Sequence, residues 1–227
     1  PTHPTARASH THRHNPPSLH AALREYDPAR AHLLEPIADA AAAISRRLAT
    51  ATCDSFECFS SVGAGDDELA VDVAAETLLL GALRDSRSVA VAASPLTPGM
   101  AAKFLCDDPR GTYSVAMNPL DGSSVLDTNF AVATLFAVFA GTSLTNVTGR
   151  DIVLAGCATY GPRTTLSLAH VDGPGVTEFL LAEDAGGTDG GTWVRSNEYS
   201  SIGEGKLFAP GNLRAVKDHS GYAELVK

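Results

Sequence analysis

Apolar residues in the first half of the chain recur at helical spacing. Over residues 34–50 the apolar positions that share one face are Leu34, Ile37, Ala41, Ile44 and Leu48. Arg46 and Arg47 fall on the opposite side, so this segment predicts an amphipathic helix with one buried stripe. A second helix is expected from Asp66 to Arg84, because the acids at its start complement the positive end of the helix dipole.

The second half of the chain is dominated by strand patterns. Runs of β-branched, aromatic and small apolar residues predict strands at Ser88–Ala93, Thr112–Ala116, Thr128–Ala140, Arg163–Val171 and Val176–Ala182. The last two flank the turn residues 172–175 and are expected to form a hairpin. The apolar segment 151–160 fits either a strand or a helix. An exposed loop is expected at 183–191, followed by a short strand that begins at Trp193.

Composition places the chain among soluble globular proteins. It has 227 residues, of which 44% are apolar and 19% charged, enough for a sizeable core. The net charge of −9 argues against nucleic acid and anionic membranes as partners, and no apolar stretch reaches transmembrane length. Four cysteines are too few for a disulfide scaffold of this size, so reduced thiols are expected.

The N-terminal segment differs from the rest. Residues 1–32 are rich in His, Pro, Arg and Ala and lack sustained hydrophobic periodicity. This composition predicts a disordered or weakly ordered segment, followed by one domain over residues 33–227. The segment has no apolar signal region, so secretion is not expected, and the absence of an initiator Met indicates a fragment or a processed form.

One stretch carries candidate chemistry, Met117-Asn118-Pro119-Leu120-Asp121-Gly122-Ser123-Ser124, between two predicted strands. Pro119 fixes φ and Gly122 permits a positive φ, so a sharp turn is expected with Asp121 beside it. Backbone N–H groups and serine hydroxyls suit a phosphate, and a neighbouring carboxylate suits a hard cation such as Mg²⁺. A plain polar turn between two strands is the alternative interpretation.

This stretch resembles the Asp-Pro-Leu-Asp-Gly-Ser-Ser signature of the fructose-1,6-bisphosphatase and sedoheptulose-1,7-bisphosphatase family. Further strings look like sedoheptulose bisphosphatase in the same order, namely Gly65–Asp72, Leu126–Phe130, Tyr160–Thr165, Glu178–Leu181 and Gly205–Arg214. The resemblance runs from about Pro36 to the C-terminus, and several motifs agree rather than one.

The resemblance implies the α/β layered fold of the sugar phosphatases, represented mainly by its N-terminal half. The implied reaction is Mg²⁺-dependent hydrolysis of the 1-phosphate of sedoheptulose-1,7-bisphosphate or fructose-1,6-bisphosphate, in carbohydrate metabolism. The residues that the resemblance implies for this site are Asp66 and Asp72 as catalytic acids, Asn118, Leu120 and Asp121 at the metal, and Gly122, Ser123 and Ser124 at the phosphate.

The sequence also departs from this family. Pro95 and Leu96 stand where the family has two adjacent metal-binding glutamates, and Asn118 stands where it has an aspartate. The final third of the relatives, with a further metal-binding glutamate, has no counterpart here. A weakened Mg²⁺ site and impaired activity are therefore expected. The alternative is a non-catalytic homologue that binds a sugar phosphate or pairs with an active subunit.

The resemblance carries weaker expectations for other residues. Lys206, Asn212 and Arg214 are expected to border the sugar-phosphate pocket, where Arg suits bidentate phosphate contact. Cys53 and Cys58 match in spacing the redox pair of plastid relatives, although they also fit two unrelated small residues. A homo-oligomer, dimer or tetramer, is expected by resemblance, in the cytoplasm, a plastid or another organelle.

Overall fold

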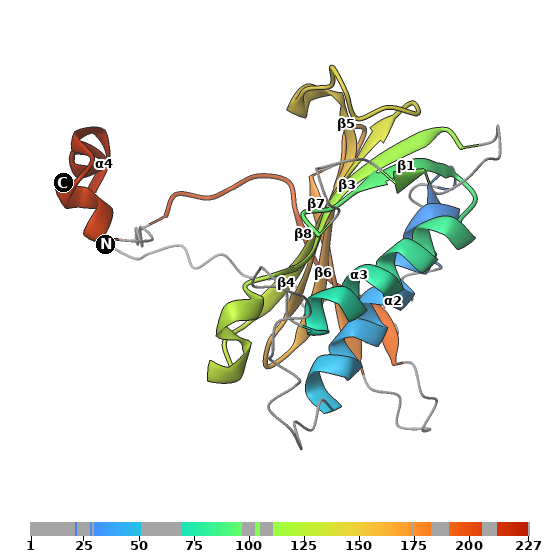
Figure 1. The fold of residues 1–227 in the computed structure, drawn as a ribbon, viewed down its shortest axis with the longest axis horizontal. Helices are drawn as coiled ribbons and strands as arrows, with labels where there is room; N and C mark the ends of the chain where they lie inside the picture. Colours follow the sequence, from blue (N-terminus) through green and yellow to red (C-terminus); the bar gives the residue numbers. More distant parts are fainter. Residues whose placement is uncertain are drawn as a thin grey trace, which may run out of the picture.

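The part of the chain that the structure describes folds around a mixed β-sheet, with the helices α2 (Ala31–Thr50) and α3 (Ala70–Asp85) against one of its faces (Figure 1). The computed structural model describes residues 30–50, 70–96, 103–104, 111–173, 175–182, 191–205 and 213–226, together with residues 21 and 28. The helices and turns of this part are α2 (Ala31–Thr50), α3 (Ala70–Asp85), η3 (Ser123–Thr128), η4 (Gly149–Asp151), η5 (Leu213–Lys217) and α4 (Ser220–Val226). The strands are β1 (Val89–Ala93), β2 (Lys103–Phe104), β3 (Tyr113–Asp121), β4 (Val132–Ala140), β5 (Ile152–Tyr160), β6 (Thr164–His170), β7 (Val176–Ala182) and β8 (Thr192–Tyr199).

The sheet has the strand order β2-β1-β3-β4-β5-β6-β7-β8. Strands β1 and β3 run parallel, and every other neighbouring pair is antiparallel. From β3 onward each strand therefore pairs with the next strand in sequence. This arrangement confirms the layered mixed α/β fold that the sequence predicts.

The core lies between the two helices and one face of the sheet. Alternate residues of β4 point into it, and Val132, Thr134, Phe136 and Val138 are all buried. The other side of the core is the apolar stripe of α2, in which Leu33, Ile37 and Ile44 are almost fully enclosed. The indole Nε1 of Trp193 donates a hydrogen bond to the carbonyl of Ala38 at 3.1 Å, which ties β8 to α2.

Most predicted elements are confirmed within the described residues. α2 begins a few residues before the predicted Leu34, and Arg46 and Arg47 on it are exposed as predicted. The apolar segment 151–160, which fitted either a strand or a helix, contains strand β5. β6 and β7 form the predicted antiparallel hairpin. Residues 66–69 at the start of the second predicted helix, the loop at 183–190 and nearly all of segment 1–29 lie outside the described residues.

Two predicted boundaries around the central stretch were wrong. β3 continues through the whole of Met117–Asp121, and the turn begins only at Gly122, whose φ is 84°. The following strand does not begin at Thr128, because that residue closes a 3₁₀ helix and Asn129 adopts a left-handed conformation with φ 61°. A positive φ cannot continue a strand, so β4 begins at Val132.

Gly156 allows an aromatic ring to lie across the sheet. It pairs with Phe136 of the neighbouring strand, and a Cβ added at Gly156 would lie 2.1 Å from the tip of that ring. We expect Gly156→Ala to destabilise the protein by about 1–3 kcal/mol, because the buried ring must leave its position. Gly81→Ala in α3 is the control. A Cβ there meets nothing within 4 Å, so we expect the free energy of unfolding to increase by about 0.5–1 kcal/mol. Urea unfolding of both variants checks this, and equal stability changes would contradict it.

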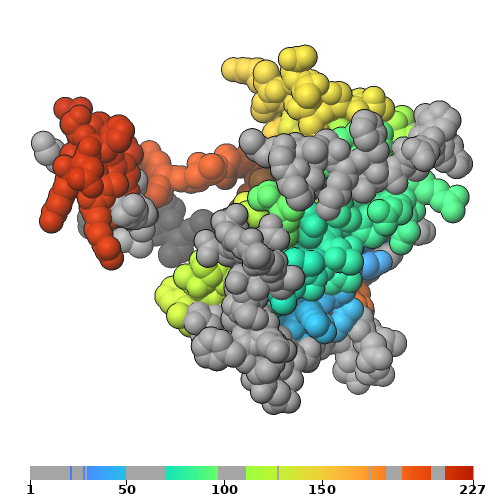
Figure 2. All heavy atoms as spheres, in the orientation of Figure 1, coloured from blue at the N-terminus to red at the C-terminus, as the bar shows by residue number. Residues whose placement is uncertain are grey.

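The C-terminal elements η5 and α4 pack against each other. Figures 1 and 2 show them as a lobe at a distance from the sheet and the helices α2 and α3. None of the helices within the described residues combines the length and apolar character needed to cross a bilayer.

Candidate functional site

The candidate site lies where β3 ends. The amide Nδ2 of Asn118 donates a hydrogen bond to Oδ1 of Asp121 at 3.0 Å, so the two side chains lie together on the same part of the strand. Gly122 then turns the chain in a left-handed conformation into η3, which begins with Ser123. The structure thus brings together the residues from Asn118 to Ser124 that the sequence singled out.

These residues differ in exposure in a way that suits ligand binding. Asp121, Gly122 and Ser124 are exposed and Ser123 is half-buried. The side chain of Leu120, in contrast, is 4% exposed and anchors the end of the strand in the core. The polar groups of the turn are therefore accessible on a fixed base, which suits the capture of an anion or a hydrated cation.

Buried hydroxyl groups lie beneath this turn. The hydroxyl of Thr134 donates to the carbonyl oxygen of Pro119 at 2.7 Å. The hydroxyl of Tyr160 lies 2.7 Å from the same Thr134 oxygen. Thr134 and Tyr160 are 1% and 5% exposed, so water does not compete for these hydrogen bonds. Sequence analysis missed both residues, since their contact with the turn depends on the pairing of three strands.

Burial raises the pKa of Tyr160 well above the ordinary tyrosine value, and the hydrogen bond to Thr134 only partly offsets this. The folded state therefore holds the phenol proton more tightly than the unfolded chain does. Stability from this group is complete below about pH 10 and is lost as the pH rises further, at up to about 1.4 kcal/mol per pH unit.

Tyr160→Phe is accordingly expected to lose about 1 kcal/mol at pH 8, where the hydrogen bond is missing. Its stability deficit relative to the parent chain should shrink above about pH 10, because there the phenol ionises in the unfolded parent chain but stays protonated in the folded one. Urea unfolding between pH 8 and 11 measures this, with the exposed Tyr199→Phe as the control. A deficit that stays constant with pH would contradict the expectation.

Two buried acids lie on α3. Asp72 and Glu76 are 6% and 8% exposed and lie one helical turn apart on the same face. The hydroxyl of Ser94, just after β1, donates a short hydrogen bond to Oε1 of Glu76. Helix α3 packs against β1 and β3, the strands that lead to Ser94 and to the candidate turn. Sequence analysis named Asp72 but missed Glu76, although the spacing of four residues was a usable signal.

Pro95 and Leu96 follow Ser94 in a turn, and neither has a side chain that can bind a metal. Within the described ranges no group of three or more His, Cys, Asp or Glu side chains gathers in a way that could hold a metal ion. Of the three residues expected at the metal, Asn118 and Asp121 are hydrogen-bonded to each other at the end of β3. The apolar side chain of Leu120 is buried, so only its backbone carbonyl could serve as a ligand. One carboxylate with neutral oxygens fits a Mg²⁺ ion that keeps several waters and shares a phosphate.

Of the remaining predicted site residues, the structure describes Asp72 on α3 and Arg214 on η5. Asp66, Cys53, Cys58, Lys206 and Asn212 lie outside the described residues. Arg214 is exposed on η5, within the lobe that stands away from the sheet (Figure 1).

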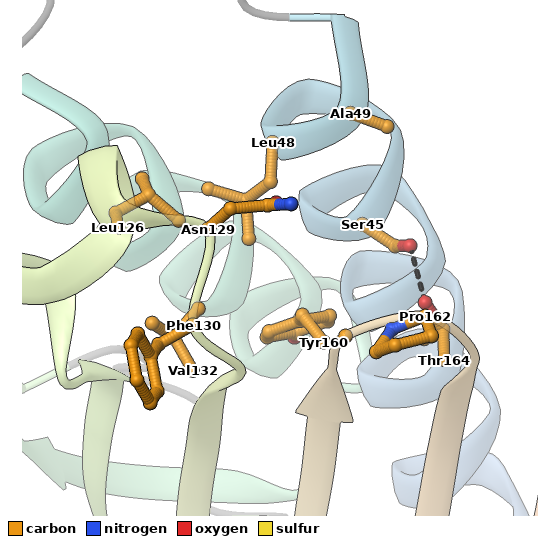
Figure 3. A pocket seen from close by; sticks show the side chains of 11 residues that line it. Ser45, Leu48, Ala49, Leu126, Asn129, Phe130, Val132, Tyr160, Pro162 and Thr164 are labelled. Carbon is orange, nitrogen blue, oxygen red and sulfur yellow. Dashed lines mark hydrogen bonds between the residues drawn. The ribbon is translucent and has the colours of Figure 1, made fainter.

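A cavity of about 400 Å³ lies beside the turn, between the end of α2, η3 and the β5–β6 turn (Figure 3). Its walls include Leu48, Leu126, Phe130 and Pro162, and its lining residues carry no ionisable side chain other than Tyr160. The hydroxyls of Ser45 and Thr164 meet across one wall at 2.6 Å. The cavity lining has neither a cationic side chain nor a carboxylate that could hold a cation beside a phosphate, whereas the exposed turn has Asp121, so the turn remains the phosphate-binding candidate.

The layered sheet with two helices on one face, and a turn at the end of β3 that carries a carboxylate and two serines, make this a mixed α/β domain. Residues 21–195 match the family described as "Fructose-1-6-bisphosphatase, N-terminal domain". The chain therefore belongs to the fructose-1,6-bisphosphatase family, as its motifs predict.

Among curated proteins, the chain is similar to sedoheptulose-1,7-bisphosphatases of this family. The chain is 43% identical over 203 residues to the chloroplastic sedoheptulose-1,7-bisphosphatase of Chlamydomonas reinhardtii, covering 88% of this chain and 48% of the relative. It is 45% identical over 184 residues to the same enzyme of Spinacia oleracea, covering 81% and 45%. The chain thus spans about half the length of the curated relatives it matches.

Solved structures agree in fold. A crystal structure assigned as a sedoheptulose-1,7-bisphosphatase from Toxoplasma gondii is similar with a TM-score of 0.74 and 27% identity, covering 92% of this chain and 68% of that one. Fructose-1,6-bisphosphatase of Leishmania major in its holo form gives a TM-score of 0.67 at 24% identity, covering 80% and 58%. The latter supports the fold alone.

Proposed function

We propose that this chain is the metal- and phosphate-binding part of a sugar bisphosphatase of the sedoheptulose-1,7-bisphosphatase type. Its reaction would be the hydrolysis of the 1-phosphate with Mg²⁺, within carbohydrate metabolism. The observation that carries the proposal is the turn from Asn118 to Ser124, in which the Asn118 amide and the Asp121 carboxylate are hydrogen-bonded and Ser123 and Ser124 follow directly after Gly122. The relatives at 43% and 45% identity favour sedoheptulose over fructose bisphosphate as the substrate.

In this proposal Asp121, Asn118 and the Leu120 carbonyl hold the metal, and Gly122, Ser123 and Ser124 receive the phosphate through N–H and O–H donors. A bound Mg²⁺ would supply charge neutralisation at the phosphoryl group and a water of lowered pKa. Asp66 and Asp72 are proposed as the acids that complete the network around the attacking water. Lys206, Asn212 and Arg214 are proposed as weaker contacts to the sugar phosphate.

We propose further that the Mg²⁺ site is weakened and the activity impaired. Asn118 contributes a neutral oxygen where the family has a carboxylate, and Pro95 and Leu96 contribute none. Phosphoryl transfer depends mainly on positioning and charge neutralisation, so each lost acid removes transition-state stabilisation. The second candidate is a non-catalytic homologue that binds a sugar phosphate or pairs with an active subunit, which the same substitutions favour.

The test is phosphate release from both bisphosphates at saturating Mg²⁺. We expect turnover below about 0.01 s⁻¹, a thousandfold under the median enzyme value of about 10 s⁻¹. Turnover near the ordinary value would reject the impaired-site proposal and leave an active bisphosphatase. Saturable binding of inorganic phosphate in a calorimetric titration, together with no phosphate release above background, would favour the second candidate.

Assembly and location are also proposals. We propose a homo-oligomer, a dimer or a tetramer, in the cytoplasm, a plastid or another organelle, with the two chloroplastic relatives as support for a plastid. Light scattering of the purified chain tests the assembly, and a monomer at micromolar concentration would refute it. The pair Cys53 and Cys58 is proposed as a redox pair, which thiol labelling before and after reduction would test.

A further inference from the structure

We propose that Thr134 and Tyr160 are positioning residues for the candidate site, because they fix the irregular backbone that brings Asn118 and Asp121 to one face of the sheet. The proposal deepens the function proposed above and rests on it for the identity of the ligand. The backbone argument itself depends only on the described geometry of β3, β4 and β5.

The strand pairing is irregular at the site. Asn118 pairs with Leu135 and Asp121 pairs with Ala133, so two residues of β3 stand opposite the single residue Thr134. This is a β-bulge with Pro119 and Leu120 as the doubled residues. Pro119 has no N–H and cannot donate to a neighbouring strand, which makes it suited to such a break.

The bulge decides on which face the polar side chains lie. In a regular strand, residues three apart point to opposite faces of the sheet. Asn118 and Asp121 are three apart, yet their partners on β4 are two apart and share one face. The extra residue thus brings both side chains to the same face, where they form their hydrogen bond of 3.0 Å.

The hydrogen-bonded hydroxyls of Thr134 and Tyr160 hold this bulge in place. The Thr134 hydroxyl carries one hydrogen, and it donates this to the Pro119 carbonyl at 2.7 Å. The Tyr160 hydroxyl, 2.7 Å away, must therefore be the donor to Thr134. A side-chain hydrogen bond replaces the interrupted strand pairing, and a second one fixes the orientation of the first.

Because these residues are buried, water cannot readily replace the hydrogen bonds of Thr134 and Tyr160. Thr134 is 1% exposed, Tyr160 5%, and Pro119 is buried as well. Loss of the Thr134 hydroxyl leaves the Pro119 carbonyl without that donor and without ready access to water. The bulge is then free to shift, and Asp121 and Gly122 shift with it.

The test compares Thr134→Val with Thr134→Ser in the full chain. Valine removes the hydroxyl at nearly constant shape, whereas serine keeps it. We expect Thr134→Val to weaken Mg²⁺-dependent binding of inorganic phosphate at least tenfold and Thr134→Ser to change it less than threefold. Tyr160→Phe should weaken it about threefold. Thr177→Val on β7, also buried on the helix-covered face, is the control for general loss of stability and should leave binding unchanged.

A second readout separates this inference from the proposed function. Amide chemical shifts of Asp121, Gly122 and Ser123 without ligand should move in Thr134→Val and stay near the parent values in Thr134→Ser. Equal shifts in the two variants, or equal effects of Thr134→Val and Thr177→Val, would overturn the proposal. If the parent chain binds neither Mg²⁺ nor phosphate, the proposed function fails and the amide shifts still decide the positioning role. If Thr134→Val does not fold, the same shifts in Tyr160→Phe decide it, and unchanged values there would overturn it.

Discussion

Asn118→Asp is expected to bind Mg²⁺ at least tenfold more tightly than the parent chain and to be less stable without the metal. The amide of Asn118 now donates to the Asp121 carboxylate at 3.0 Å. An aspartate there would replace this attraction by the repulsion of two carboxylates, which only a proton or a cation relieves. A tenfold gain in affinity corresponds to about 1.4 kcal/mol of binding free energy, which is a modest effect for one added ligand charge.

Thermal unfolding with and without MgCl₂ measures both halves of this expectation. The melting temperature of Asn118→Asp should lie below that of the parent without Mg²⁺ and rise more steeply as Mg²⁺ is added. Asn129→Asp is the matched control, because it adds the same charge at an exposed residue just after η3. Equal Mg²⁺ responses of the two variants would show that the effect is general electrostatics, and would count against a metal site at Asp121.

Leu79→Ala is expected to destabilise the fold by about 2–5 kcal/mol. Leu79 is 2% exposed and packs into the core between α3 and the sheet, so its removal leaves a cavity. The neighbouring Leu78 lies on the same helix but is 37% exposed, and Leu78→Ala should cost less than about 1 kcal/mol. Urea unfolding of the two variants gives the comparison. Similar losses of stability in the two variants would mean that the face of α3 with Leu79 is not the one packed against the core.

The main elements were predictable because their patterns are local. The apolar stripe of α2 recurs at helical spacing, and the β6–β7 hairpin has a glycine-rich turn between two alternating runs. The candidate turn was also predictable, since Gly122 has a positive φ that the glycine permits. Local patterns do not fix boundaries as well, which is why β3 extends beyond the predicted strand end and β4 starts later.

The features that sequence reasoning missed depend on contacts between distant residues. The bulge opposite Thr134 follows from the pairing register of β3 and β4, and no single strand reveals its register. The contact of Tyr160 with Thr134 joins residues 26 positions apart across two strands. The hydrogen bond from Ser94 to Glu76 likewise needs the docking of α3 on β1. Such tertiary contacts become visible only once the strands and helices are placed.

The departures that we infer at Pro95, Leu96 and Asn118 rest on the resemblance to the family and not on these residues alone. Pro95 and Leu96 lie in the turn after β1, where they give no sign of a missing ligand by themselves. Asn118 is well accommodated, with a partner in Asp121. We therefore expect these residues to affect metal binding and catalysis rather than folding.

The central claim is that the turn from Asn118 to Ser124 binds phosphate together with a divalent cation. Titration of the isotopically labelled chain with inorganic phosphate, followed by NMR with and without Mg²⁺, tests it most directly. We predict saturable shifts of the Gly122, Ser123 and Ser124 amides that require Mg²⁺. Saturable shifts confined to residues away from this turn, or none at millimolar phosphate with Mg²⁺, would contradict the claim.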